Sequence, residues 1–97
     1  MSQVILTEKA SSDIFRLYLF LLAKNEPSAK RAVQTIKSAF NLLAQHPELG
    51  RPVENEPELK ELLIDFGNSG YTALYHFEQN TDQVIILAIR HQREAGY

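Results

Sequence analysis

Val84-Ile85-Ile86-Leu87-Ala88-Ile89 is the stretch that decides the fold of this chain. These six consecutive apolar residues are mostly β-branched, and they follow a polar segment, residues 79–82, that is typical of a turn. A short apolar run bounded by a turn predicts a strand that is buried on both faces. We therefore expect residues 84–89 to form an interior strand of a sheet.

Polar side chains of a distinct kind follow this strand. The chain continues with Arg90, His91, Arg93 and the last residue, Tyr97, which an interior strand would deliver to one edge of the sheet. Two cations, an imidazole and a phenol can stabilise a phosphate or transfer a proton. Arg and Tyr are also enriched among the anchors of protein interfaces. On residue types alone a solvated tail is the better explanation, so the case for a functional surface depends on the rest of the chain.

Two amphipathic helices are expected before the strands. In the first, residues 8 to about 24, Thr7 is placed to act as the N-cap. Its apolar residues recur at spacings of three and four: Ala10, Ile14, Leu17, Tyr18 and Leu21. The second, residues 28 to about 45, has a stricter stripe: Ala29, Ala32, Val33, Ile36, Ala39, Phe40 and Leu43. The short break at residues 25–27 predicts an antiparallel helical hairpin.

The first helix carries more apolar residues than one buried face requires. At 100° per residue, Phe15 and Leu19 lie toward one flank and Phe20 lies on the opposite flank. Either the core wraps this helix on several sides, or these side chains form a second apolar face that binds another protein.

Strand candidates surround the helices. Residues 3–6 precede the first helix, and residues 59–66 and 71–78 follow a loop at residues 48–52 and an acidic connector at residues 53–57. The turn at residues 67–70 makes these two strands a hairpin. The succession β-α-α-β-β-β predicts an α+β fold, with a helical hairpin packed on one face of a small, mainly antiparallel sheet. We expect residues 1–97 to form one domain.

Composition excludes several classes of function. The net charge is −2, and residues 54–82 hold seven acidic residues against one basic residue, unlike the basic surface of a nucleic-acid-binding protein. Without cysteine there is no disulfide or thiolate metal site, and the three histidines fall on unrelated elements, so we expect no metal and no cofactor. The N-terminus does not have the pattern of a signal peptide, and the longest apolar run, residues 17–23, is too short to cross a bilayer. A cytoplasmic protein is expected.

Three motifs together resemble the ParE branch of the ParE/RelE toxin superfamily. They are His46-Pro47-Glu48-Leu49-Gly50-Arg51, the pair Gly70-Tyr71, and the C-terminal block at residues 86–97. The resemblance covers nearly the whole chain, and the C-terminal block is its specific part. It implies the toxin of a bacterial type II toxin–antitoxin operon. Such a toxin is neutralised by a ParD-like antitoxin, whose C-terminal segment is disordered when free and folds over the toxin in a hetero-oligomer.

The resemblance implies two different targets. ParE-like members inhibit DNA gyrase, whereas RelE-like members cleave mRNA on the ribosome. RelE-like ribonucleases carry a basic residue where this chain has Thr72, although Arg90, Arg93 and Tyr97 match the basic and tyrosine residues that they use near the C-terminus.

A gyrase inhibitor that is not itself a catalyst is therefore the expectation, because a ribonuclease needs several cations at the scissile phosphate and a surface that approaches RNA. The predicted target-binding residues are Arg90, His91, Arg93 and Tyr97, and the predicted antitoxin-binding residues are Phe15, Leu19 and Phe20. The alternatives are a ribosome-dependent mRNA endonuclease and a non-toxic binding module of the same fold.

Overall fold

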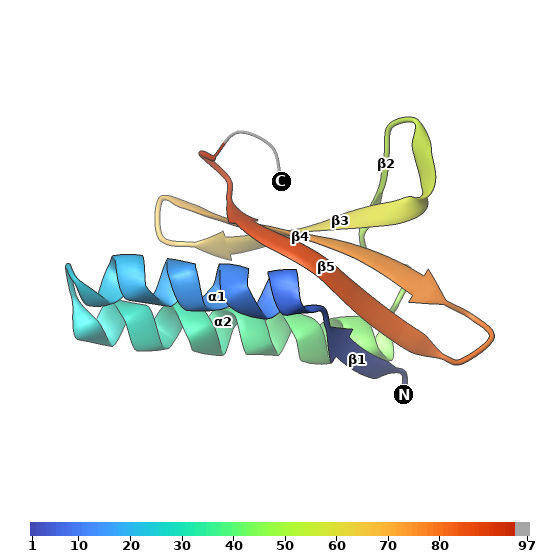
Figure 1. Ribbon diagram of the computed structural model, residues 1–97, viewed down its shortest axis with the longest axis horizontal. Helices are drawn as coiled ribbons and strands as arrows, with labels where there is room; N and C mark the ends of the chain where they lie inside the picture. Colours follow the sequence, from blue (N-terminus) through green and yellow to red (C-terminus); the bar gives the residue numbers. More distant parts are fainter. Residues whose placement is uncertain (95–97) are drawn as a thin grey trace.

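The molecule has two layers, a helical hairpin and a five-stranded sheet (Figure 1). The computed structural model describes residues 1–94. Its elements are β1 (Gln3–Leu6), α1 (Glu8–Leu22), α2 (Glu26–Gln45), β2 (Arg51–Val53), β3 (Glu56–Phe66), β4 (Ser69–Glu78) and β5 (Gln83–His91). The strand order is β1-β5-β4-β3-β2; β1 runs parallel to β5 and the other neighbours are antiparallel. This arrangement confirms the predicted α+β class.

Both helices begin at a residue whose side chain caps them. Thr7 Oγ1 accepts the N–H of Ala10 at 3.1 Å, and Asn25 Oδ1 accepts the N–H of Ser28 at 3.0 Å. Because Asn25 is the cap and a proline is well tolerated in the first turn, α2 starts two residues before the predicted start. α1 ends at Leu22, two residues before its predicted end. Neither helix has the length and apolarity needed to span a membrane within residues 1–94.

The hydrophobic core lies between the helical hairpin and one face of the sheet. Tyr71, Ala73 and Tyr75 of β4, which lie on one face of the strand, are almost fully buried there. The buried apolar residues of this core are Ala10, Leu17, Ala32, Ile36, Phe40, Leu43, Ile64, Tyr71, Ala73, Tyr75, Val84, Ile86 and Ile89.

β5 is an interior strand, as predicted, but it is not buried on both faces. Val84 and Ile86 are fully buried against the helices. Ile85 and Leu87 point to the other face and are only half-buried, because both helices cover the same side of the sheet (Figure 1). The apolar run therefore indicated the strand correctly and its two-sided burial wrongly.

A bulge changes which side chains of β5 face the helices. Ala88 pairs with Leu74 and Ile86 pairs with the next residue of β4, which leaves Leu87 as an extra residue. The extra residue shifts the alternation by one position. As a result Ile89, which is 1% exposed, joins the core, and His91 is brought to the helix side of the sheet.

α1 completes the hydrogen bonding of β5 after β1 ends. β1 pairs with β5 only as far as Ile86. Beyond that point Thr7 Oγ1 lies 3.1 Å from the carbonyl oxygens of Ile86 and Leu87, and the buried carboxylate of Asp13 accepts the N–H of Ile89 at 3.0 Å. Two side chains at the start of α1 thus replace the missing strand and hold the helix against β5.

The loop after α2 is anchored by Tyr75. Its hydroxyl accepts the N–H of Gly50 at 2.8 Å and donates to the carbonyl oxygen of Pro47 at 2.7 Å. A Cβ at Gly50 would lie 2.6 Å from the Tyr75 ring, so only glycine fits this position. The predictions of a loop at residues 48–52 and a connector at residues 53–57 were wrong in part. Residues 51–53 form β2 and β3 already begins at Glu56, because pairing between the two segments extends the sheet.

Replacing Tyr75 with Phe tests this anchor. We expect the free energy of unfolding to fall by about 1–3 kcal/mol, since two buried backbone groups lose their hydrogen-bond partner. Urea denaturation measures the change. Tyr71→Phe is the matched control: Tyr71 is 2% exposed, and its hydroxyl has no hydrogen-bond partner among residues 1–94. Equal losses in the two variants would contradict the assignment.

His76 of β4 contacts two acceptors, one on β3 and one on its own strand. Its Nδ1 lies 2.9 Å from the carbonyl oxygen of Glu58, and its Nε2 lies 3.5 Å from the Glu78 carboxylate. The hydrogen bond to the Glu58 carbonyl, followed by the interaction with Glu78, raises the pKa of His76 above its ordinary 6.5. A raised pKa means that the folded state favours the charged ring. The resulting stabilisation is complete below the ordinary pKa and is lost as the pH rises through the folded value.

The stability difference between the wild type and His76→Gln should therefore depend on pH. We expect a larger difference at about pH 5.5 than at about pH 8, because glutamine can donate a hydrogen bond but does not titrate. Urea denaturation at both values measures it, and the NMR titration of His76 should have its midpoint above 6.5. A difference that is the same at both pH values would show that the ring contributes no charge-dependent stability.

Candidate functional site

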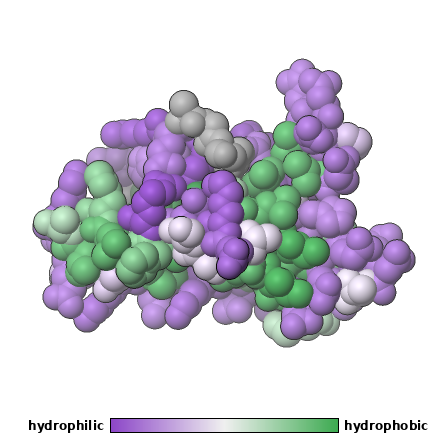
Figure 2. Space-filling model, viewed as in Figure 1, coloured by the Kyte–Doolittle hydropathy of each residue, from purple (hydrophilic) through white to green (hydrophobic). Residues whose placement is uncertain are grey.

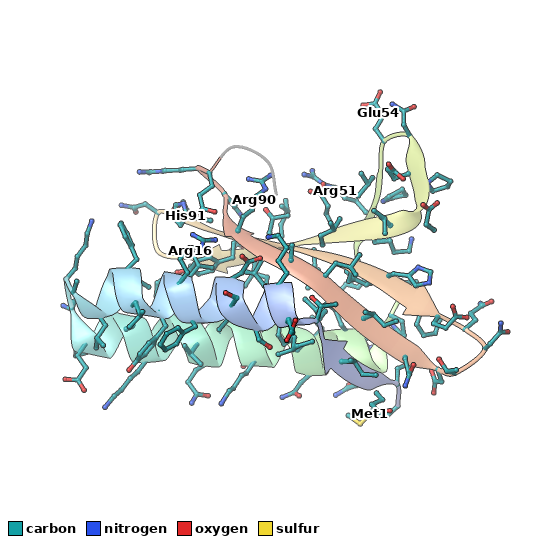
Figure 3. The ribbon with its side chains drawn as sticks, in the orientation of Figure 1. Met1, Arg16, Arg51, Glu54, Arg90 and His91 are labelled. Carbon is teal, nitrogen blue, oxygen red and sulfur yellow. The ribbon has the colours of Figure 1, made fainter. Side chains whose placement is uncertain are left out.

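Three of the four predicted target-binding residues, Arg90, His91 and Arg93, lie at the end of β5 and in the turn after it. Arg90 and His91 are neighbours in the strand, so they lie on opposite faces of the sheet. His91 lies on the α1 side, close to Arg16, and Arg90 lies on the open side (Figure 3). Arg93 is exposed in the turn. Tyr97 lies outside the described residues.

Arg90 holds in shape the turn that follows β5, residues 92–94, which we call the C-terminal turn. Its Nη1 donates to the carbonyl oxygen of Glu94 at 2.8 Å and lies 3.4 Å from the carbonyl oxygens of His91 and Gln92. Its cross-strand neighbour Thr72 is 1% exposed. A guanidinium that binds several carbonyls in succession fixes the path of the backbone. Arg90 therefore acts first on the turn that presents Arg93.

His91 is packed and fully engaged by its neighbours. Nδ1 accepts the backbone N–H of Arg93 at 3.1 Å, and Nε2 lies 2.9 Å from the Ser69 hydroxyl. Since Nδ1 is an acceptor, the neutral ring carries its proton on Nε2 and donates it to Ser69. The ring also meets Tyr71 edge to face at 5.7 Å. His91 consequently links the C-terminal turn to β4.

Gly70 allows β4 to approach this turn closely. A Cβ at Gly70 would lie 1.9 Å from the carbonyl oxygen of Ile64, so the hairpin partner leaves no room for a side chain. The carbonyl oxygen of Gly70 accepts the N–H of Gln92 at 2.8 Å, and the Gln92 side chain reaches the carbonyl of Tyr71 at 3.3 Å. The Gly70-Tyr71 motif thus supports the same turn as His91.

A groove of about 740 Å³ lies between α1, the β3–β4 turn and the end of β5. It brings one predicted antitoxin-binding residue, Phe20, together with two predicted target-binding residues, His91 and Arg93. At this end of the molecule hydrophobic surface adjoins hydrophilic surface (Figure 2). The groove is lined by Arg16, Leu17, Phe20, Leu21, Lys24, Phe66, Gly67, Asn68, Ser69, Tyr71, His91, Arg93 and Glu94.

Two cations of this groove were not predicted from the sequence. Arg16 stands four residues before Phe20 on α1, and Lys24 stands four residues after it, in the turn that follows the helix. Lys24 Nζ lies 4.4 Å from the centre of the Phe20 ring. Arg16 pairs with Glu94 of the C-terminal turn at 2.5 Å. The spacing of four around an exposed aromatic residue is the signal in the sequence that indicates this flank.

The other two predicted antitoxin-binding residues lie on a different surface. Phe15 and Leu19 are 61% and 46% exposed and, with Leu22 at 36%, form a stripe on the side of α1 that faces away from the core. Phe20 is also 61% exposed but lies on the groove flank. The predicted set of three therefore divides between two surfaces: Phe15 and Leu19 belong to an outer stripe (Phe15, Leu19 and Leu22), and Phe20 belongs to the groove.

Residues 1–94 contain no set of side chains arranged to bind a metal ion. No group of three or more histidine or acidic side chains lies close enough together there to hold a metal ion. The charged and polar groups of the groove belong to arginine, lysine, serine, asparagine and tyrosine side chains, with one histidine and one carboxylate. Such a surface suits the recognition of another macromolecule.

Comparison with known proteins identifies relatives over nearly the whole chain. The family model of the ParE toxin of type II toxin–antitoxin systems (parDE) matches residues 4–96. Toxin RelE3 of Caulobacter vibrioides is 36% identical over 94 residues, which is 97% of this chain and 98% of that protein.

Solved structures share the fold. The chromosomal ParDE toxin–antitoxin system from P. aeruginosa contains a chain with a TM-score of 0.76 and 24% identity, covering 94% of this chain and 96% of that one. The intact E. coli RelBE toxin–antitoxin complex contains one with a TM-score of 0.67 and 12% identity, covering 98% and 100%. At these identities the likeness is one of fold.

Proposed function

Since the chain belongs to the ParE toxin family of type II toxin–antitoxin systems, we propose that it inhibits DNA gyrase by protein contact and that a ParD-like antitoxin silences it. Gyrase works in the cytoplasm, so the proposal also puts the toxin and its antitoxin there. The turn with His91 and Arg93 contacts the target, and the exposed apolar residues of α1 contact the antitoxin.

The hydrogen bonds that Arg90 makes to the C-terminal turn are the main observation in favour of gyrase as the target. Cleavage of RNA needs preorganised cations around the scissile phosphate. Arg90 instead binds the carbonyl oxygens of the C-terminal turn, and its neighbour across the strand is the buried, uncharged Thr72. Thr72 stands where RelE-like ribonucleases have a basic residue. These contacts support a turn shaped for protein recognition.

Charge supports the same target. The chain carries a net charge of −2, and seven acidic residues are concentrated in residues 54–82. Proteins that act on ribosome-bound mRNA gain affinity by neutralising phosphates with Lys and Arg. An acidic protein has less of this attraction, whereas a protein target can match a surface with both signs of charge.

A ribosome-dependent mRNA endonuclease is the second candidate. It is favoured by the relative at 36% identity, which carries the name RelE3. Arg90, Arg93 and Tyr97 would be its catalytic residues. A non-toxic binding module remains the third candidate, in which the same surfaces bind a partner without harm to the cell.

The exposed apolar side chains of α1 and an open edge of the sheet support the proposed antitoxin-binding surface. Phe15, Leu19 and Leu22 leave a stripe of apolar surface on α1 to which an amphipathic helix can bind. β3 offers an edge as well, because β2 pairs with it only at Glu56, Lys60 and Glu61. Residues 62–66 have no strand on that side within residues 1–94, so an extended antitoxin segment can add to the sheet there.

Supercoiling of relaxed plasmid by purified gyrase tests the target. We expect the protein to inhibit the reaction, and Arg93→Gln to reduce its potency about tenfold, because exposed arginines are frequent interface anchors. Lys37→Gln, on the outer side of α2, is the control and should leave the potency unchanged. Growth arrest with normal gyrase activity and new 5′ ends in cellular mRNA would establish the endonuclease instead. Normal growth without antitoxin would establish the binding module.

Substitution of the outer stripe tests the antitoxin surface. Phe15→Ser or Leu19→Ser should leave the chain folded, because both side chains are largely exposed, and should weaken antitoxin binding tenfold or more, about 1.4 kcal/mol. Isothermal titration measures the affinity, and circular dichroism monitors the fold. Unfolding of either variant would show that these residues stabilise the core. Unchanged affinity in a folded variant would place the antitoxin elsewhere.

A further inference from the structure

The groove between α1 and the C-terminal turn combines an apolar floor with a cationic rim. Leu17, Tyr71 and the half-buried Leu21 and Phe66 form the floor, and the exposed Phe20 forms one wall. Its volume of about 740 Å³ falls in the range of about 300–1,000 Å³ that encloses a compact ligand. This is enough for a few apolar anchor side chains of a peptide segment.

The charge around the groove is positive although the chain as a whole is negative. Arg16, Lys24 and Arg93 line it, against one carboxylate, Glu94, among residues 1–94. Because Glu94 already pairs with Arg16, two cations are left to attract an acidic partner. Apolar anchors next to carboxylates are therefore the chemistry that complements this surface.

Glu94 can dissociate from its ion pair with Arg16 at little cost in stability. Arg16 makes two contacts with the Glu94 carboxylate, at 2.5 and 3.3 Å, and a longer one of 3.7 Å with Asp13. Asp13 is also held by Lys9 and by the N–H of Ile89, so it stays in place when Glu94 leaves. Glu94 is 36% exposed in a turn, and an ion pair of this exposure contributes little stability.

We propose that this groove binds an acidic, apolar segment of the antitoxin, and that a carboxylate of that segment displaces Glu94 from Arg16. The inference rests on the proposed function, because it takes the antitoxin as the partner. The apolar side chains of the antitoxin segment would occupy the floor of the groove beside Phe20, and its remaining acidic groups would meet Lys24 and Arg93. His91 and Arg93 line the same groove, so the bound segment covers the residues that we propose contact the target. Silencing is then direct competition for one surface.

Replacing Glu94 with Gln tests whether an antitoxin carboxylate takes the place of Glu94 at Arg16. Removing this carboxylate leaves Arg16 ready for the incoming one, so we expect antitoxin affinity to rise about two- to fivefold. Arg16→Gln should lower it about tenfold, because a charge-assisted hydrogen bond is lost. The double variant should bind as weakly as Arg16→Gln alone.

The experiment titrates the proposed ParD-like antitoxin into the full chain by calorimetry. Arg31→Gln on α2 is the control for a lost arginine, and Leu42→Ser is the control for Phe20→Ser, since Leu42 is also exposed at 46%. Phe20→Ser should weaken binding about tenfold, and neither control should change it. Circular dichroism of each variant confirms that it is folded.

An unchanged or lower affinity of Glu94→Gln would overturn the exchange at Arg16. Affinities that are unchanged in Phe20→Ser and Arg16→Gln would overturn the groove as the binding site, while binding of the wild type would leave the proposed antitoxin partner in place. No binding to the wild type would overturn the antitoxin as the partner as well as the groove as its binding site. Self-association of the free chain that is lost in Phe20→Ser would assign the groove to a second copy instead. The gyrase assay is independent of all four outcomes.

Discussion

One edge of β5 is hydrogen-bonded first by β1 and then by side chains at the start of α1. The arrangement of the rest of the structure depends on this change of partner. β1 pairs with the first half of the strand and ends at Leu6. From there the Thr7 hydroxyl and the Asp13 carboxylate of α1 take over, reaching the carbonyls of Ile86 and Leu87 and the N–H of Ile89. Buried backbone groups without a partner are strongly unfavourable, so these bonds set the position of α1 along β5.

The position of α1 in turn creates the groove. With Asp13 held at Ile89, the next turns of the helix run beside the end of the strand, which brings Arg16 to Glu94 and Phe20 to His91. One structural anchor thus joins the surface that we assign to the antitoxin with the surface that we assign to the target. A toxin arranged in this way can be silenced by covering the turn to which we assign target binding.

The exposed apolar residues follow from the size of the chain. Two helices on one face of a five-stranded sheet bury that face and leave the other face and the outer side of α1 without cover. Phe15, Leu19 and Leu22 on α1 and Leu63 on the open face of the sheet remain largely exposed. Such surface is unfavourable in water unless a partner covers it, which agrees with a protein that is stored in a complex.

The sequence by itself determined the order of the elements, the helical hairpin, the interior position of β5 and the family, because periodicity, caps, turns and a specific C-terminal block are local properties. Where it failed, the cause was contact between distant residues. Pairing with β3 turned part of a predicted loop into β2, and the position of both helices on one side of the sheet left Ile85 and Leu87 only half-buried. Only the tertiary structure decided that Phe20 belongs with His91 and Arg93 while Phe15 and Leu19 do not, and that Arg90 holds a turn. Each of these depends on how α1 crosses β5, through hydrogen bonds that span more than seventy residues of chain.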